Sequence, residues 1–375
     1  MLREEHTLLR DALREFASTR LAPFAAQWDR DHTFPRDALK ELAALGCYGI
    51  AVPEAYGGAG MDYTAVAVAL EEIAAGDGGV STVISVNNCP VCAILMAYGS
   101  EAQKRQFLVP LARGEALGAF CLTEPHVGSN AAALKTRAQR DGDAYVINGV
   151  KQFITSGKHA DYAIVIAVTD PAAGKRGISA FLVPTATPGY TVARLEEKTG
   201  QHSSDTAQIL FDNCRVPAAN LIGEEGEGYK IALSSLEGGR IGIAAQSVGM
   251  ARAAFEAALK YAKERESFGQ PIFNHQAVNF RLADMATQIE AARQLVLHAA
   301  ALRDAGRPCL KEAAMAKLFA SEMAEKVCSD AIQIHGGYGY VTDFPVERIW
   351  RDVRVCQIYE GTSDIQRMLI GRALG

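Results

Sequence analysis

The sequence lacks the short motifs that mark four common classes of enzyme. It contains no G-x-G-x-x-G fingerprint, no G-x-x-x-x-G-K-[ST] loop, no H-E-x-x-H pair and no G-x-S-x-G elbow. These absences argue against a Rossmann dehydrogenase, a P-loop nucleotide triphosphatase, a zinc peptidase and an α/β-hydrolase.

The chain also has no long run of basic residues, and its formal net charge is −5. Proteins that bind nucleic acid usually carry a basic patch, so nucleic acid is not an expected partner. No apolar run is expected to reach the roughly 20 residues that span a bilayer. Residues 1–6 lack the apolar core of a signal peptide, so we expect a cytoplasmic protein without integral membrane contact.

The eight cysteines are scattered through the chain and lie mostly among apolar residues. Cys89 and Cys92 form a lone C-x-x-C, which fits a redox pair or half of a zinc site. No second pair supplies the missing zinc ligands. Buried free thiols in a reducing compartment are therefore the favoured interpretation, and no metal is expected.

The 375 residues, 49% of them hydrophobic, can bury more than one core. The periodicity of the apolar residues changes twice along the chain. Residues 1–118 are predicted to form an N-terminal helical domain. Residues 119–230 carry short β-branched runs and are predicted to form an antiparallel β-barrel or sandwich. Residues 231–375 return to long helical patterns, as in a four-helix bundle, which makes the fold class α+β and multidomain.

A carboxylate directly before Gly-Thr-Ser is the most informative local pattern. Glu360 precedes Gly361, which lets a ligand approach the backbone, and Thr362, which can cap a following helix. A candidate base therefore stands beside hydrogen-bond donors, as proton removal next to a carbonyl requires. Taken alone, the pattern is more typical of a solvated or capping glutamate.

Three other segments fit cofactor binding, and each also has a structural explanation. Residues 120–130 run from an apolar stretch into a polar turn, as any strand does when it enters a loop. Arg265 could hold a phosphate, or it could simply favour the end of a helix dipole. Residues 333–340 form a turn rich in glycine, suited to a pyrophosphate or to a tight link between helices. Within this turn, His335 is expected to be packed rather than catalytic.

Taken together, these segments resemble the acyl-CoA dehydrogenase family of flavoenzymes over essentially the whole chain. The resemblance is closest to the short-chain, butyryl-CoA-dehydrogenase-like members. The matching segments occur in the family's order and spacing: 84–88, 121–136, 236–243, 265–269, 275–276, 333–337, 348–352 and 359–362.

The resemblance implies a role for individual residues. Glu360 is the base that removes the α-proton, and Gly239 stands where some relatives carry a rival base. The FAD would contact residues from several parts of the chain, some of them from a neighbouring subunit: Phe120, Leu122, Thr123, Ser129, Phe153, Thr155, Arg265, Phe268, Gln276, Gln333, Gly336, Gly337, Thr362 and Asp364. The acyl-CoA would contact Ser129, Glu237, Arg240 and Gly361.

The resemblance further implies α,β-dehydrogenation of a short- or medium-chain acyl-CoA, as in β-oxidation of fatty acids. The hydride would pass to the flavin N5, and electrons would then pass to electron-transferring flavoprotein. A homotetramer is implied as well. Alternatives are an acyl-CoA oxidase, a flavoprotein with other chemistry such as nitroalkane oxidation or desulfination, and a non-catalytic assembly protein. Asn130 and His126 depart from the family pattern, so the fine shape of the flavin loop is open.

Overall fold

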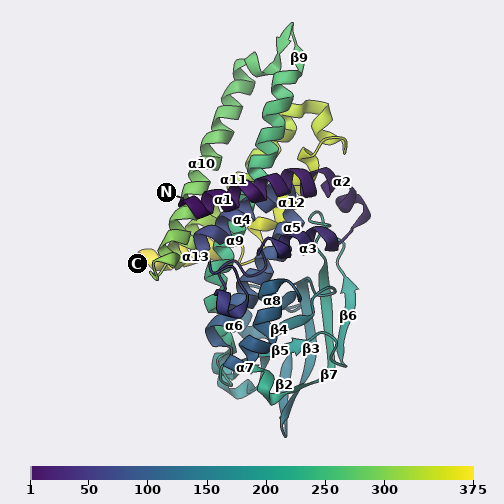
Figure 1. The fold of residues 1–375 in the computed structure, drawn as a ribbon, viewed down its shortest axis with the longest axis vertical. Helices are drawn as coiled ribbons and strands as arrows, with labels where there is room; N and C mark the ends of the chain where they lie inside the picture. The colour runs from purple at the N-terminus through teal and green to yellow at the C-terminus, as the bar shows by residue number, and fades with distance from the viewer. Residues whose placement is uncertain (1) are drawn as a thin grey trace.

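The computed structural model describes residues 2–375 and places a layer of helices above a sheet, with long helices extending beyond both (Figure 1). The N-terminal helices are joined by short π-helical turns at Ala17–Leu21, Asn87–Cys92 and Lys104–Leu108. Their bounds are α1 Glu4–Phe16, α2 Ala22–Asp31, α3 Arg36–Ala44, α4 Tyr63–Gly76, α5 Gly78–Val86, α6 Ala93–Tyr98, α7 Glu101–Gln103 and α8 Val109–Arg113.

Two aspartates set the start of the buried helices in this layer. Asp62 precedes α4 and accepts a hydrogen bond from the Ala65 N–H at 2.9 Å. Asp77 precedes α5 and accepts one from the Val80 N–H at 2.9 Å. Each carboxylate satisfies a donor that the first helical turn leaves free, so each helix begins at a defined residue.

The helical stretch Gly78–Tyr98 corrects one expectation from the sequence. Its 21 residues are long and apolar enough to cross a membrane by length and composition, although we expected no such run. Most of it is buried inside the molecule, at 78% of the most apolar window. A helix buried in this way is a core helix, which explains its apolar composition without a bilayer.

The middle of the chain forms one sheet with the strand order β6-β7-β3-β2-β4-β5-β8, and β1 pairs with β4. Most pairs are antiparallel, as expected, but β1 and β2 both pair in parallel with β4, so the sheet is mixed. The strands are β1 Gly118–Cys121, β2 Arg137–Asp141, β3 Ala144–Thr155, β4 Tyr162–Val168, β5 Ile178–Pro184, β6 Tyr190–Leu195, β7 Thr206–Pro217 and β8 Leu221–Ile222.

The C-terminal region is helical, and its longest helices form a bundle. In Figure 1 the hairpin between α9 and α10, closed by the short strands β9 Glu266–Ser267 and β10 Gln270–Pro271, projects to the end opposite the sheet. Helix α11 packs against α9, α10 and α13. The bounds are α9 Gly228–Glu264, α10 Gln276–Asp304, α11 Leu310–His335, α12 Val346–Val353 and α13 Ser363–Leu374.

Three apolar cores hold these parts together. The largest joins the N-terminal helices α1, α4 and α5 to the long C-terminal helices. A second lies between helices α6 to α8 and one face of the sheet. The third fills the other face of the sheet. The expected order of helices, strands and helices along the chain is therefore confirmed. Helix α9 contacts both the other helices and the strands β4 and β5, so it joins the helical and sheet regions.

Candidate active site

Glu360 lies in a turn between α12 and α13, where it can face the middle of α9. The residue is half-buried, but its Oε2 atom is inaccessible to solvent and has no hydrogen-bond partner among residues 2–375. The Glu360 backbone N–H likewise donates no hydrogen bond within that part of the chain. A buried carboxylate oxygen without a partner is costly in a folded protein, so such a group is a candidate for chemistry.

The backbone of this turn is unusual. Glu360 has a φ of 54° and Gly361 a φ of 92°, so two successive residues adopt the left-handed region. Glycine enters this region freely, but a glutamate does so at a cost of roughly 1–2 kcal/mol. Thr362 then caps α13, and its side chain accepts a hydrogen bond from the Ile365 N–H at 3.4 Å. The surrounding structure therefore fixes the direction in which Glu360 leaves the backbone.

Helix α9 provides the surface against which the carboxyl group lies. A Cβ atom at Gly239 would stand 2.7 Å from Glu360 Oε2 and 3.0 Å from its Cδ. Only a glycine therefore leaves room for the carboxyl group in this position. The neighbouring Arg240 is 5% exposed, and its Nε has no partner among the described residues.

Burial dominates the electrostatics of this carboxyl group. It raises the pKa of Glu360 from 4.5 to about 7, although the positive charges of Arg240 and Lys317 act in the opposite direction. A base with a pKa near 7 is matched to proton transfer at neutral pH, because it is substantially ionised yet still holds a proton well. The site can therefore accept a proton from a weakly acidic group placed against Glu360.

Two residues that hold this turn were not found from the sequence. Lys317 of α11 donates from Nζ to the Gly361 carbonyl at 2.7 Å. Gln366 of α13 donates from Nε2 to the same carbonyl at 2.8 Å and to the Glu360 carbonyl at 3.2 Å. The available signal was a single lysine within the apolar run 313–320, which predicts a charge facing the interior.

The residues expected beside the flavin ring gather where β1 and β3 meet. Phe120 lies on β1 and is half-buried, as are Leu122 and Thr123 just beyond the strand. The Gln152 N–H of β3 donates to the Thr123 carbonyl at 2.8 Å, which joins the two strands. Thr155, also on β3, is half-buried. These side chains therefore share one side of the sheet domain.

Phe153 is exposed because of a local irregularity in β3. The pairing of β3 with β7 shifts register between Lys151 and Ile154, and Phe153 has a φ of 58°. Its ring is 63% exposed although it belongs to a strand of the central sheet. Bulges of this kind redirect a side chain out of a sheet. The ring is available to pack against a flat ligand.

An ion pair buried behind this loop supports its shape. Lys151 Nζ lies 2.8 Å from Glu124 Oε1 and donates to the Leu122 carbonyl at 2.9 Å. The Glu124 carboxylate also accepts the backbone N–H groups of Lys135 and Thr136, at 2.7 and 2.9 Å. Both charged side chains are at most 1% exposed. The local sequence does not reveal this pair, because an isolated lysine in a strand gives no sign of its partner.

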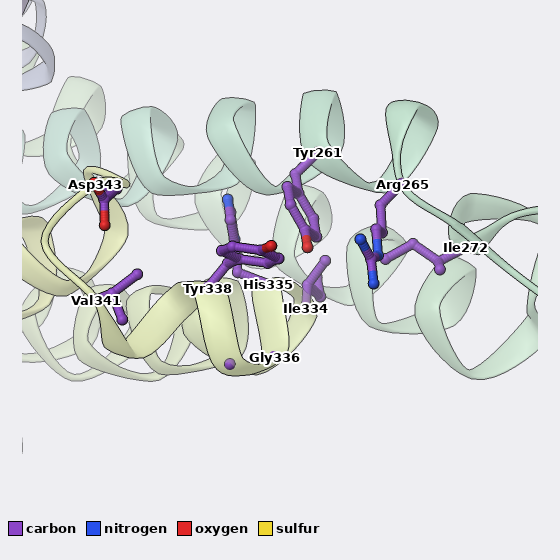
Figure 2. A pocket seen from close by; sticks show the side chains of 10 residues that line it. Tyr261, Arg265, Ile272, Ile334, His335, Gly336, Tyr338, Val341 and Asp343 are labelled. Atoms are coloured by element: carbon purple, nitrogen blue, oxygen red, sulfur yellow. The ribbon is translucent and has the colours of Figure 1, made fainter.

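A second group of expected cofactor residues lies at the far end of the bundle. Arg265, Gly336 and Gly337 line a hollow of about 560 Å³. Figure 2 shows Tyr261 and Arg265 extending from α9 toward the end of α11. A Cβ at either glycine would meet no atom within 4 Å, so both face open space. The volume suits one part of a nucleotide-sized ligand.

Around this hollow, His335 is packed as expected. Its ring stacks on Tyr261 at 4.4 Å between centroids, and its Nδ1 hydrogen-bonds the Ala331 carbonyl at 2.8 Å. Burial lowers its pKa from 6.5, which keeps the ring neutral. The other residues expected at this end are exposed: Phe268, Gln276 and Gln333.

The structure therefore divides the expected cofactor residues into two groups. In Figure 1 the hairpin tip at β9, next to Arg265 and Phe268 in the chain, lies at the opposite end of the molecule from the sheet, whose strand β3 includes Phe153.

The remaining expected residues occupy less decisive positions. Glu237 pairs with Arg303 at 3.1 Å and accepts a contact from Cys309 Sγ at 3.2 Å, so its carboxylate is already engaged. Ser129 and Asp364 are exposed, as are the two positions that depart from the family pattern, His126 and Asn130.

The thiols are as expected. All eight cysteines, including Cys89 and Cys92, are free and buried. No group of three metal-binding side chains occurs in residues 2–375.

The chemistry of these groups fits the FAD that the resemblance implies. The sheet side offers an exposed ring at Phe153 and half-buried hydroxyl residues at Thr123 and Thr155, which suit contact with a flat polar ring. The bundle end offers a guanidinium at Arg265 beside two open glycines, which suits a pyrophosphate. FAD bound in this way would supply a two-electron acceptor for hydride.

Comparison with known proteins gives the same answer along the whole chain. The models of the acyl-CoA dehydrogenase N-terminal, middle and C-terminal domains match residues 3–115, 119–214 and 226–375. An acyl-CoA dehydrogenase of Bacillus subtilis is 48% identical over 99% of this chain and 98% of its own. The rat mitochondrial short-chain specific acyl-CoA dehydrogenase is 47% identical over 98% of this chain and 90% of its own.

A solved structure agrees with the sequence matches. The butyryl-CoA dehydrogenase of Megasphaera elsdenii superimposes with a TM-score of 0.97 and 43% identity, covering 100% of this chain and 99% of its own. The chain therefore belongs to the acyl-CoA dehydrogenase family and is an FAD-dependent oxidoreductase that acts on acyl-CoA.

Proposed function

We propose that this protein converts a short- or medium-chain acyl-CoA to the trans-2-enoyl-CoA, with Glu360 as the base that removes the α-proton. The observation that carries the proposal is the Glu360 carboxyl group, whose Oε2 is buried and unpaired among residues 2–375 and whose pKa burial raises to about 7. Residue 239, where some relatives carry the base, is a glycine, so no second carboxylate at this position can take the place of Glu360. The names of the short-chain and butyryl-CoA relatives support the lower end of the range of chain length.

Each part of the turn has a role in this reaction. The Glu360 carboxylate accepts the proton from the carbon next to the thioester. The Glu360 N–H, free of other partners in residues 2–375, can donate to the thioester oxygen and so stabilise the negative charge that develops there. Gly361 lets the substrate lie close to the backbone. A bound FAD would supply the acceptor for the hydride that leaves the β-carbon.

The direct test is the Glu360→Gln variant. The amide keeps the size of the side chain but cannot accept the proton, so flavin reduction by butyryl-CoA under anaerobic conditions should slow by about three orders of magnitude or more. The flavin content per chain should stay unchanged. Glu15→Gln on the exposed face of α1 is the matched control and should reduce its flavin at the wild-type rate. Equal rates in wild type and Glu360→Gln would place the base elsewhere.

The acceptor of the electrons is part of the same proposal. We infer electron-transferring flavoprotein as the acceptor, as the family resemblance implies. Reoxidation of the reduced enzyme should then be slow in air and fast with the flavoprotein. Stoichiometric hydrogen peroxide without any added acceptor would instead identify an acyl-CoA oxidase. Bleaching of the flavin by a nitroalkane or an acyl-CoA sulfinate would indicate a different chemistry, and colourless protein would indicate an assembly role.

We also propose that the protein is a homotetramer in which two chains complete each FAD site. The support comes from the two separated groups of cofactor residues and from the bare tip of the α9–α10 hairpin. There, Phe268 is 98% exposed, an unusual state for a large aromatic side chain. Domain boundaries near residues 118 and 230 and a cytoplasmic location complete the proposal. Light scattering of the FAD-loaded protein tests the subunit count.

A further inference from the structure

The turn that carries Glu360 is held by a lysine that has no carboxylate partner. Lys317 is fully buried on α11, and no salt bridge to it occurs within 4.0 Å in residues 2–375. Its Nζ donates a hydrogen bond to the Gly361 carbonyl at 2.7 Å. Burying an ammonium group without a counter-ion is expensive, and burial lowers the pKa of Lys317 to about 8. Because burial of the Lys317 ammonium group is costly, we expect the group to have a function where its Nζ lies.

Lys317 Nζ points to the turn formed by Glu360 and Gly361. Because Glu360 and Gly361 both have positive φ, their backbone needs partners that keep it from relaxing. The Gly361 carbonyl receives two of them, from Lys317 and from Gln366, whose side chains are both fully buried. These donors come from different helices, α11 and α13. The turn is therefore clamped from two sides, with a charge on one side only.

The charge of Lys317 also acts on Glu360 through space. It is one of two cations that oppose the effect of burial on the Glu360 carboxyl group, the other being Arg240. The titratable and charged groups that surround the pair come from the π-helical turn before α6, from α9, from α11 and from the segment after α12. They are Cys89, Arg240, Glu322, Cys356 and Tyr359.

We infer that Lys317 is a positioning residue for the reaction: its Nζ fixes the Glu360–Gly361 turn, and its positive charge favours the ionised form of the Glu360 carboxyl group. The inference rests on the proposed role of Glu360 as the base. It adds that the Glu360 carboxylate must be held in a fixed direction and must also stay ionised at neutral pH, so that it can accept a proton.

Three variants at residue 317 separate the charge from the hydrogen bond. Lys317→Met removes both, Lys317→Gln removes the charge but retains a donor, and Lys317→Arg retains the charge. In each of them the Gly361 carbonyl keeps its bond from Gln366, so no buried acceptor is left unpaired. Exchange of a buried charge for an apolar group of similar size is often tolerated, so folded protein is expected. Lys326→Met, on the exposed face of the same helix, is the matched control.

The measurement is the pH profile of flavin reduction by butyryl-CoA in the anaerobic holoenzyme. Loss of a nearby cation should move the midpoint upward by about one pH unit in both Lys317→Met and Lys317→Gln. Below the midpoint this corresponds to a roughly tenfold slower reduction. Lys317→Arg and Lys326→Met should keep the wild-type midpoint. Flavin content and the melting temperature, measured in parallel, should stay near the wild-type values.

The outcomes distinguish this inference from the proposed function. If Glu360→Gln abolishes flavin reduction but both uncharged variants keep the wild-type midpoint, Glu360 is the base and the role of Lys317 is refuted. If Glu360→Gln reduces its flavin normally, the proposed function itself fails. Should Lys317→Met not yield folded protein, the midpoint of Lys317→Gln compared with Lys317→Arg decides the question alone.

Discussion

Substitution of Gly239 by alanine is a sharp test of where the Glu360 carboxyl group lies. The added methyl group would stand 2.7 Å from Oε2, whereas ordinary contact begins at 3.4 Å, so the oxygen has to move by about 0.7 Å. The atom in the way is the end of a flexible side chain, so the move is easily made. Alanine also favours the helix by about 1 kcal/mol over glycine. The fold and the FAD content should therefore be unaffected.

The reaction should respond much more strongly than the fold. A misplacement of about 1 Å can cost roughly 100-fold in rate, so a shift of this size should slow flavin reduction by about 10- to 100-fold. This loss corresponds to about 1.4–2.7 kcal/mol in the activation free energy. The assay is anaerobic stopped-flow reduction of the bound flavin at saturating butyryl-CoA, which isolates chemistry from binding.

Gly371→Ala on α13 is the control for the Gly239 variant. A Cβ at that position would meet no atom within 4 Å, so it adds the helical preference of alanine without crowding any group. Its flavin should be reduced at the wild-type rate. The reasoning would be refuted if Gly239→Ala also reduced its flavin at the wild-type rate while Glu360→Gln did not. The carboxyl group would then act from a position away from α9.

Three further predictions follow from other parts of the site. Because burial raises the pKa of Glu360 to about 7, flavin reduction should rise with pH through a midpoint near 7. Since the pKa of Glu360 is higher in the folded than in the unfolded state, the wild type should lose stability as the pH rises from 4.5 to 7. Glu360→Gln has no such group, so between pH 4.5 and pH 8 its free energy of unfolding should rise relative to that of the wild type by about 3 kcal/mol. Arg265→Ala should lose FAD on gel filtration, while the holoenzyme that survives reduces its flavin at close to the wild-type rate. Lys151→Met should leave the Glu124 carboxylate buried without its partner, lowering the melting temperature and the FAD content through a loss of about 3–5 kcal/mol.

Each of these predictions has a result that contradicts it. A pH profile that is flat between pH 5.5 and 8.5, or equal stability of Glu360→Gln and wild type at pH 5 and 8, would contradict the raised pKa. Full FAD retention in Arg265→Ala would remove Arg265 from the cofactor site. For the ion pair, Lys151→Met combined with Glu124→Gln should recover part of the lost stability, because the double variant buries no unpaired charge. A double variant less stable than Lys151→Met would show that the pair is not coupled.

The long elements of the fold could be predicted from the sequence, because their periodicity is local. Residues 241–264 have few helix breakers and much alanine and lie within α9, and the apolar, largely β-branched run 162–168 coincides with β4. The short strands β1, β2, β6 and β8 were not predicted, since a few residues carry too little periodicity. The parallel pairing of β1 with β4 depends on contacts between distant segments, which no local pattern reveals.

The sequence predicted the central residue of the candidate site but not the residues that hold it in place. Glu360 stood out because glycine and two hydroxyl residues follow it in the sequence, and the structure gives it a buried, unpaired oxygen. Lys317 and Lys151 were missed, although each acts on the site through a hydrogen bond to a distant carbonyl. Their partners lie 44 and 29 residues away along the chain, so nothing in their immediate neighbours identified them.

The sequence by itself determined the types of the chemical groups and the order of the helices and strands, because residue identity and spacing are properties of the chain. Tertiary structure alone decided the pKa of Glu360, since that value depends on how much water α9 and α11 exclude and on which cations they bring close. It also decided that the tip of the α9–α10 hairpin lies at the end of the molecule opposite the sheet (Figure 1). Distances between segments, and the dielectric surroundings that they create, exist only once the chain has folded.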